Sequence, residues 1–199
     1  LETGVRAIDG MMTIGRGQKI GLFAQSGVGK SVLLGMIARG TDADVRLIAM
    51  TGERGREVRE FIETSLADAL DKSVVFVSPS DSPPLTKLSG LQRAIVTARH
   101  FAEQGKNVLL LVDSLTRVAT ALRDLGLASG EAPVTRGYTP SMYNFFPTIL
   151  EQAGKFKHGS LTMITTVLVE DSEDTDPVAT TARAILDGHI VLSPELARA

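Results

Sequence analysis

Two hydrophobic patterns alternate along the chain. Continuous apolar runs, typical of strands buried on both faces of a parallel sheet, occupy residues 19–24, 45–50, 73–77, 108–112, 161–169 and 189–192. Between them, apolar residues recur at the spacing of one helical face, most clearly over 142–153, 115–125 and, more loosely, 58–70. The alternation predicts an α/β fold with a mostly parallel sheet, flanking helices and right-handed crossovers.

Three segments between these elements predict loops: residues 79–84, 126–140 and 170–177. The last contains Glu170, Asp171, Glu173, Asp174 and Asp176. A calcium site would need a glycine-centred loop with regularly spaced ligands, which this segment does not have. A solvated surface loop is therefore the favoured interpretation.

Composition and charge restrict the class of protein. A length of 199 residues suits one domain, and 21 basic against 23 acidic residues give a net charge of -2, which provides no bulk attraction to nucleic acid or anionic lipid. The chain has no cysteine, which excludes disulfides, thiolate catalysis and Cys-bound metals. No apolar run reaches the ~20 residues that cross a bilayer. We therefore expect a cytoplasmic protein that does not bind nucleic acid.

The segment I-G-L-F-A-Q-S-G-V-G-K-S, residues 20–31, predicts a phosphate-binding loop. A glycine-rich turn between a buried strand and a helix exposes backbone N–H groups to a phosphate. Lys30 would reach the β- and γ-phosphates, and the Ser31 hydroxyl would bind Mg2+. Ala24 replaces the usual first glycine, at a strand exit where a small residue suffices. The residues predicted to hold the nucleotide are Ser26, Gly27, Val28, Gly29, Lys30, Ser31 and Val32.

Acidic residues follow two other predicted strands. Asp113 ends the run V-L-L-L-V-D and is the predicted partner of Mg2+, although an aspartate there could also cap a helix. Glu53 follows the strand at 45–50, at the sheet edge where ligands bind in open α/β folds, and is the candidate base that orients water. Arg54, beside it, could face phosphate. The alternative for Glu53 is a charged, solvated helix start, which the phosphate loop makes less favourable.

The motifs G-V-R-A-I-D-G, F-A-Q-S-G-V-G-K-S, G-E-R-G-R-E-V-R-E-F, L-L-L-V-D-S-L-T-R, G-L-A-S-G-E and I-L-D-G-H-I-V-L-S appear in this order. Together they resemble the catalytic domain of flagellar and type III protein-export ATPases, relatives of the F-type ATP synthase β subunit. The resemblance implies a RecA-like core that binds ATP and Mg2+ and hydrolyses ATP. It assigns Glu53 as the catalytic glutamate, and places Arg54 and Arg117 near the γ-phosphate.

The resemblance also implies partners. Members of this family act as homohexamers, contact regulator and stalk proteins and chaperone–substrate complexes, and sit at the cytoplasmic face of a membrane export gate. They carry a β-barrel before and a helical domain after the segment matched by these 199 residues. We expect the chain to be a fragment of such a protein. The arginine finger and the adenine-stacking aromatic would then lie outside it, and the fragment alone would bind nucleotide weakly and barely hydrolyse it.

Two other functions stay open at this point. One is a catalytic subunit of an ion-translocating rotary ATPase, against which Gly55, Gln25 and Ser26 favour an export ATPase. The other is a nucleotide-holding subunit without activity, which Glu53 disfavours because such subunits lack the base. Tyr138, Tyr143, Phe145 and Phe146 are expected in core or subunit-interface packing.

Overall fold

A computed structural model describes residues 1–169 and 175–198, and within them a seven-stranded sheet. Its strand order is β3-β2-β4-β6-β1-β7, every neighbouring pair on this path is parallel, and the short β5 adds to β6 in antiparallel orientation. The strands are β1 (Lys19–Ala24), β2 (Val45–Thr51), β3 (Ser73–Ser78), β4 (Asn107–Asp113), β5 (Gly154–Lys155), β6 (Ser160–Leu168) and β7 (Gly188–Val191). The predicted α/β class and mostly parallel sheet are confirmed.

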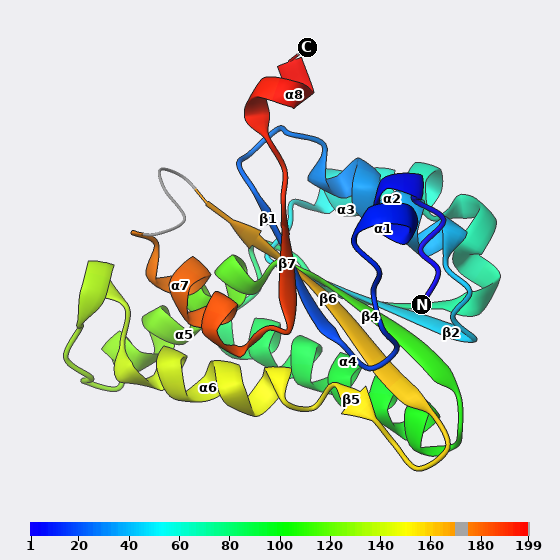
Figure 1. Ribbon diagram of the computed structural model, residues 1–199. Coiled ribbons are helices and arrows are strands. Elements are labelled where there is room, and N and C mark those ends of the chain that lie inside the picture. The colour runs from blue at the N-terminus through cyan, green and yellow to red at the C-terminus, as the bar shows by residue number, and fades with distance from the viewer. Residues whose placement is uncertain (170–174, 199) are drawn as a thin grey trace.

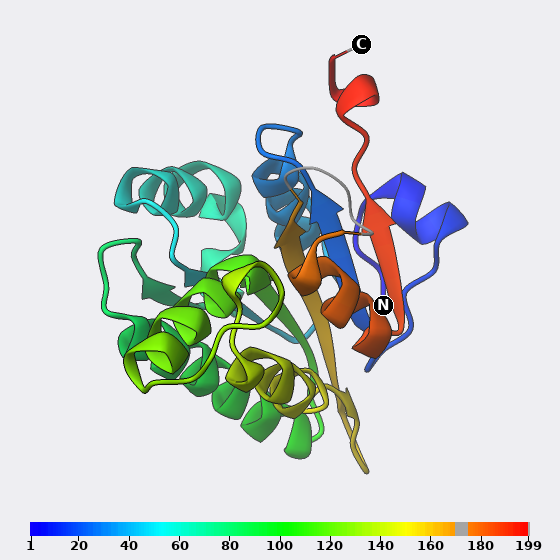
Figure 2. The same ribbon diagram turned by 90° about the vertical axis from the view of Figure 1, so that its left-hand side faces the viewer.

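Helices cover both faces of the sheet (Figures 1 and 2). They are α1 (Arg6–Met11), α2 (Lys30–Gly40), α3 (Gly55–Glu60), α4 (Pro84–Glu103), α5 (Leu115–Ala128), α6 (Pro140–Leu150) and α7 (Pro177–Ile185). The short α8 (Pro194–Arg198) follows β7 and projects away from the sheet (Figure 1). One hydrophobic core lies between the sheet and α4, α5, α6 and α7, and a second lies between the sheet and α1, α2 and α3. The sheet is therefore buried from both sides, which is why its strands read as continuous apolar runs.

Strand β4 illustrates this double burial. Leu110 and Val112 belong to one core, while Leu109 and Leu111 belong to the other. Consecutive strand residues point to opposite faces, so a strand between two cores needs an apolar side chain at every position. The run stops at Asp113, where β4 reaches the edge of the sheet.

The loop and helix boundaries depart from the predictions in three places. The predicted loop 126–140 is wrong at both ends, because α5 continues to Ala128 and α6 begins at Pro140, with a 3-10 turn at Thr135–Gly137 between them. The predicted helix over 58–70 is broken into α3, a π-turn (Phe61–Ser65) and a 3-10 helix (Ala67–Lys72). The hydrophobic period persists through such breaks. Of the predicted acidic loop, 170–174 lie outside the described residues.

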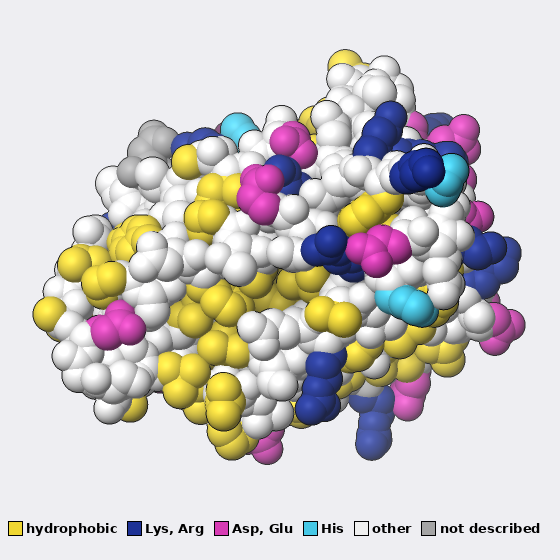
Figure 3. All heavy atoms as spheres, turned by 90° about the horizontal axis from the view of Figure 1, so that it is seen from below, with side chains coloured by type: hydrophobic (Ala, Val, Ile, Leu, Met, Phe, Trp, Pro, Cys, Tyr) yellow, Lys and Arg dark blue, Asp and Glu magenta, His cyan; other side chains and the backbone are white. Residues whose placement is uncertain are grey.

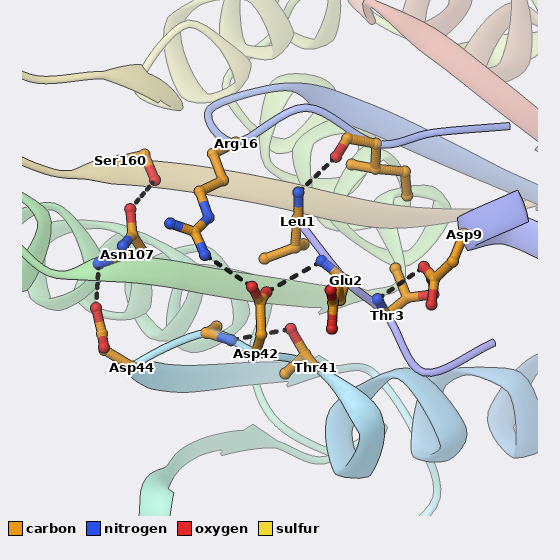
Figure 4. A network of polar contacts seen from close by, with 12 residues as sticks. Leu1, Glu2, Thr3, Asp9, Arg16, Thr41, Asp42, Asp44, Asn107 and Ser160 are labelled. Atoms are coloured by element: carbon orange, nitrogen blue, oxygen red, sulfur yellow. Dashed lines mark hydrogen bonds and ion pairs between the residues drawn. The ribbon is translucent and has the colours of Figure 1, made fainter. Parts of the chain in front are cut away.

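The end of the sheet opposite the phosphate loop is tied together by polar contacts (Figure 4). Asp42 accepts hydrogen bonds from the Arg16 guanidinium at 2.7 Å and from the Glu2 backbone at 3.0 Å. Asp44 accepts from the backbone N–H of Asn107 at 2.7 Å. These contacts join the amino-terminal segment to the start of β4.

Asp9 belongs to the same region. Its carboxylate accepts from the backbone and hydroxyl of Thr3 at 2.8 and 2.7 Å, and from the backbone of Gly4 at 2.9 Å. Desolvation disfavours the charged form, but the hydrogen bonds from Thr3 and Gly4 outweigh it and lower the pKa of Asp9. The negative charge of this group is therefore well satisfied in the folded protein.

Hydrophobic side chains gather on the outer face of the helical layer that contains α4 and α6, seen from below in Figure 3. A groove on this face is lined in part by Ile95, Val96 and Ile149. The predicted core packing of the aromatic residues is confirmed. Phe146 is fully buried in the first hydrophobic core, and Tyr138, Tyr143 and Phe145 are partly buried and pack against that core. No helix in the described part of the chain is both long enough and apolar enough to cross a bilayer.

Candidate nucleotide site

The phosphate loop connects β1 to α2 in the conformation that its glycines permit. Gly27 and Gly29 have φ angles of +81° and +90°, in the left-handed region. A Cβ atom at either position would meet nothing within 4 Å, so glycine is required here by backbone conformation and not by crowding. The loop ends at Lys30, the first residue of α2, whose free backbone N–H groups face the loop.

Ala24 does not break the motif. It is the last residue of β1, pairs with Leu168 in the register of the parallel ladder, and is buried at 3% exposure. A residue in extended conformation at a strand end does not need to be glycine. Its place at the strand end agrees with the prediction.

Lys30 lies between two acidic groups that come from other strands. Its Nζ is 2.6 Å from Oδ1 of Asp113 and 3.8 Å from Oε1 of Glu53. All three side chains are largely buried, with 5 to 12% of each exposed. The structure therefore brings the predicted phosphate-loop lysine, metal ligand and base into one cluster at the carboxyl edge of the sheet.

Glu53 differs from the other two residues of this cluster in its hydrogen bonding. Oε1 is buried and has no hydrogen-bond partner among the described residues. Burial raises the pKa of Glu53, and the neighbouring charge of Asp113 raises it further, while Lys30 and Arg117 act in the opposite direction. A carboxylate with a raised pKa is a better proton acceptor near neutral pH.

The two predicted arginines reach the site from separate helices. Arg54 is the N-cap residue of α3, is mostly exposed, and pairs with Glu57 at 3.6 Å. Arg117 is exposed on the first turn of α5. A Cβ atom placed on Gly52 would lie 2.9 Å from the Cβ of Arg117. Gly52, with a φ of +76°, allows the Glu53 loop to pass close to this arginine.

These groups line one cavity of about 350 Å³. Its walls are formed by Gln25, Ser26, Gly27, Gly29, Lys30, Ser31, Val32, Glu53, Arg54, Glu57, Arg117 and Leu168. Two of the predicted residues, Val28 and Asp113, are not among those walls. Val28 is half-buried, and Asp113, with 3% of its surface exposed, contacts Lys30. Sequence reasoning missed Gln25, Glu57 and Leu168 as lining residues, because none of them has a pattern that marks a ligand.

A magnesium nucleotide fits the donor set of this cavity. Backbone N–H groups of the glycine loop and the Lys30 ammonium suit phosphate oxygens. The Ser31 side chain in the first turn of α2 and the Asp113 carboxylate are oxygen ligands of the kind that Mg2+ prefers. The open space above Gly27 and Gly29 is a cradle that any side chain there would fill.

Asp113 also has a partner that the sequence does not reveal. The hydroxyl of Thr166 in β6 lies 2.8 Å from its Oδ1, and Thr166 is fully buried. Threonine is a common strand residue, so its presence in an apolar run indicates only β-structure.

Comparison with known proteins identifies the family. The family model described as "ATP synthase alpha/beta family, nucleotide-binding domain" matches residues 4–199. The chain belongs to this family. The RecA-like fold predicted from the sequence is the fold of its solved relatives.

Relatives of this nucleotide-binding domain include export ATPases. The chain is 52% identical to "Flagellum-specific ATP synthase" of Bacillus subtilis over 99% of its length, and 50% identical to "Type 3 secretion system ATPase" of Xanthomonas euvesicatoria, also over 99%. Each alignment covers 45% of the relative, so the chain spans less than half the length of these curated proteins. The predicted resemblance to flagellar and type III export ATPases is confirmed.

Solved structures support the same assignment. A prototypical ATPase from the type III secretion system of pathogenic bacteria superposes with a TM-score of 0.94 at 52% identity, over 98% of this chain and 57% of that chain. The assembled ATPase EscN of enteropathogenic E. coli superposes with a TM-score of 0.93 at 52% identity, over 98% of this chain and 48% of that chain. The nucleotide-binding domain is thus closely similar in backbone to type III secretion ATPases.

Proposed function

We propose that this domain binds and hydrolyses Mg-ATP as the catalytic core of a protein-export ATPase. The observation that carries the proposal is the contact of Lys30 with buried Asp113, beside the Glu53 oxygen that has no hydrogen-bond partner among the described residues. It brings the proposed phosphate-binding group, metal ligand and base together at one edge of the sheet. The relatives described above include a flagellum-specific ATP synthase and a type 3 secretion system ATPase, which favours protein export over ion translocation.

Each residue then has a separate task. The glycine loop and Lys30 bind the phosphates, while Ser31 and Asp113 would hold the metal ion. Bound Mg2+ would neutralise charge on the phosphate oxygens. Arg54 and Arg117 add positive charge on the side of the cavity that holds Glu53. These donors stabilise the charge that the transition state redistributes over the phosphate oxygens.

Glu53 distinguishes hydrolysis from simple retention of a nucleotide. A water molecule that attacks phosphorus must be oriented and must lose a proton. The carboxylate is held with one buried oxygen free of hydrogen bonds, and its pKa is raised by burial. A nucleotide-holding subunit would have no use for such a group, so this observation favours an enzyme.

The proposed partners follow the relatives. EscN has been solved as an assembled ATPase and in complex with its central stalk EscO. By analogy we propose a homohexamer that contacts a stalk protein, releases export substrates from chaperones and works peripherally at the cytoplasmic face of an export gate. The hydrophobic face over α4 and α6 supports contacts with other subunits. A net charge of -2 is consistent with a protein that does not bind nucleic acid.

An arginine finger from outside these residues is part of this proposal. Such a finger contributes about 10³- to 10⁵-fold in rate. The 199-residue chain alone is therefore proposed to bind nucleotide weakly and to hydrolyse it slowly.

ATP hydrolysis by the full-length protein tests the proposal. Glu53→Gln keeps the size of the side chain but removes the base, and we expect turnover to fall about 10²- to 10⁴-fold while nucleotide binding is retained. Glu60→Gln, an exposed substitution on α3, is the matched control and should leave turnover unchanged. Turnover that survives Glu53→Gln would show that another group is the base. Capture of export chaperones rather than ion-channel stalk subunits would separate export from ion translocation.

A further inference from the structure

Oδ1 of Asp113 accepts two hydrogen bonds, from groups that differ in mobility. Lys30 Nζ lies 2.6 Å away and Thr166 Oγ1 lies 2.8 Å away. Lys30 comes from α2, directly after the glycine loop, whereas Thr166 is in β6. The metal-ligand candidate is therefore held from two independent elements.

The direction of the bond from Thr166 follows from chemistry. An ionised carboxylate can only accept, so the hydroxyl must be the donor. The other acceptor within reach is the carbonyl oxygen of Val112, at 3.4 Å, a much longer contact than the 2.8 Å to Asp113. The single hydroxyl proton is therefore directed to the carboxylate, as a charge-assisted hydrogen bond in a buried environment.

The two donors cannot both stay in place during the proposed reaction. The Lys30 ammonium, on a flexible four-carbon stem, must turn to the phosphates, and its bond to Oδ1 is then lost. Thr166 has a stiff, β-branched side chain on a strand that pairs with β4 on one side and with β1 on the other. The Thr166 bond therefore persists when the Lys30 bond does not.

We propose that Thr166 is a positioning residue of the nucleotide site, whose hydroxyl fixes Oδ1 of Asp113 toward β6 and so leaves Oδ2 for the metal ion. Neither Lys30 nor Thr166 uses Oδ2. The inference rests on the proposed Mg-ATP function and adds to it a residue outside the sequence motifs. It predicts that the Thr166 hydroxyl matters for the response to metal and not for binding of the nucleotide itself.

The chain contains a matched control beside it. Thr165 is the preceding residue of β6 and is also fully buried, but consecutive strand residues point to opposite faces of the sheet. Its Oγ1 has no hydrogen-bond partner within the described residues. Valine is isosteric with threonine, so Thr165→Val and Thr166→Val remove the same hydroxyl from two sides of one strand.

The test uses the full-length protein and a fluorescent ATP analogue, first in EDTA and then titrated with Mg2+. We expect Thr166→Val to raise the Mg2+ concentration needed for half-maximal enhancement of binding by about 10- to 100-fold, the effect of removing a group that orients a metal ligand. Affinity in EDTA should match that of the wild type. Thr166→Ser keeps the hydroxyl and should therefore need the same Mg2+ concentration as the wild type. Thr165→Val should also need the same Mg2+ concentration as the wild type. Thermal unfolding of each variant checks the fold.

Three results would overturn the proposal. The first is a wild-type metal response in Thr166→Val. The second is an equal loss in Thr166→Val and Thr166→Ser, because the hydroxyl would then not be responsible. The third is an equal loss of affinity in EDTA and in Mg2+, which would indicate general damage to the site. A wild-type protein that binds no nucleotide would overturn the proposed function as well, so the two failures are distinguishable.

Discussion

Carboxylates at the two ends of the parallel sheet differ in their hydrogen bonding and in the direction of their pKa shifts. At the amino end, Asp9 accepts three hydrogen bonds and Asp42 accepts two, and these bonds lower the pKa of both carboxyls against the effect of desolvation. At the carboxyl end, Glu53 is buried with an oxygen that has no hydrogen-bond partner among the described residues, and burial raises its pKa. Hydrogen-bonded charges stabilise the fold, whereas a buried carboxylate oxygen that makes no hydrogen bond among the described residues, 3.8 Å from Lys30 Nζ, is retained at a cost in stability. The difference agrees with the proposed chemistry at the carboxyl end.

Lys30 and Lys19 allow the sharpest test of this contrast. The two side chains are 12 and 11% exposed, and each is paired with acidic groups, Lys30 at the carboxyl end and Lys19 at the amino end of the sheet. Lys30→Ala should reduce the affinity for nucleotide at least 100-fold, about 2.7 kcal/mol, because a phosphate partner is lost. Lys19→Ala should leave that affinity unchanged.

Calorimetric titration of the full-length variants with an ATP analogue measures these affinities. The free energy of unfolding from urea titration gives the second readout. Both lysine variants should lose stability, since each leaves carboxylates without a cation. Equal losses of nucleotide affinity would contradict the division between the two ends.

Glu53→Gln should make the nucleotide-free protein more stable. A buried polar group without a partner costs about 1–3 kcal/mol, and the amide removes the charge that makes this cost large. The effect depends on pH: because the folded pKa is raised above 4.5, the native state holds the proton more tightly, and stability is lost as pH rises through the folded pKa. Urea unfolding in EDTA between pH 4 and 8 should show this slope in the wild type and in Glu60→Gln, and not in Glu53→Gln. A loss of stability in Glu53→Gln at pH 8 would contradict the interpretation.

Asp9→Asn should change the free energy of unfolding in the opposite direction and make the protein less stable. The variant loses charge-assisted hydrogen bonds from Thr3 and Gly4, and since the group is exposed we expect it to lose about 1 kcal/mol at pH 7. The folded pKa is lowered below 3.8, so this contribution is present above that value and is lost as pH falls through the folded pKa. The stability difference between wild type and variant should therefore shrink toward pH 3. A difference that stays constant with pH would mean that the charge is not involved.

Arg16→Gln should have the smallest effect. The ion pair with Asp42 is short, at 2.7 Å, but both side chains are over 30% exposed. Exposed pairs contribute about 0.2–1 kcal/mol and are screened by salt. Unfolding in low salt and in 1 M NaCl should show a small difference that vanishes at the higher ionic strength. A loss above about 2 kcal/mol would show that the whole network depends on this pair.

The strands, the parallel sheet and the phosphate loop could be predicted from local sequence patterns. Strands buried between two cores leave uninterrupted apolar runs, as in β4, and a loop with left-handed residues leaves glycines, as at Gly27 and Gly29. Both requirements act on neighbouring residues, so the order of amino acids records them. The acids at strand ends were predicted from the strand pattern, because a parallel sheet brings the carboxyl ends of its strands to one edge.

The contacts of those acids depend on residues that are far apart in the chain. Lys30 and Asp113 are 83 positions apart, and Thr166 is 53 positions from Asp113, so no local pattern links them. The π-turn after α3 also packs closely on α2, since a Cβ on Gly35 would lie 2.7 Å from that of Ser65, a contact between residues 30 positions apart. Burial, hydrogen-bond satisfaction and the pKa of Glu53 are properties of groups brought together by folding. They become visible only when the distances between strands are known.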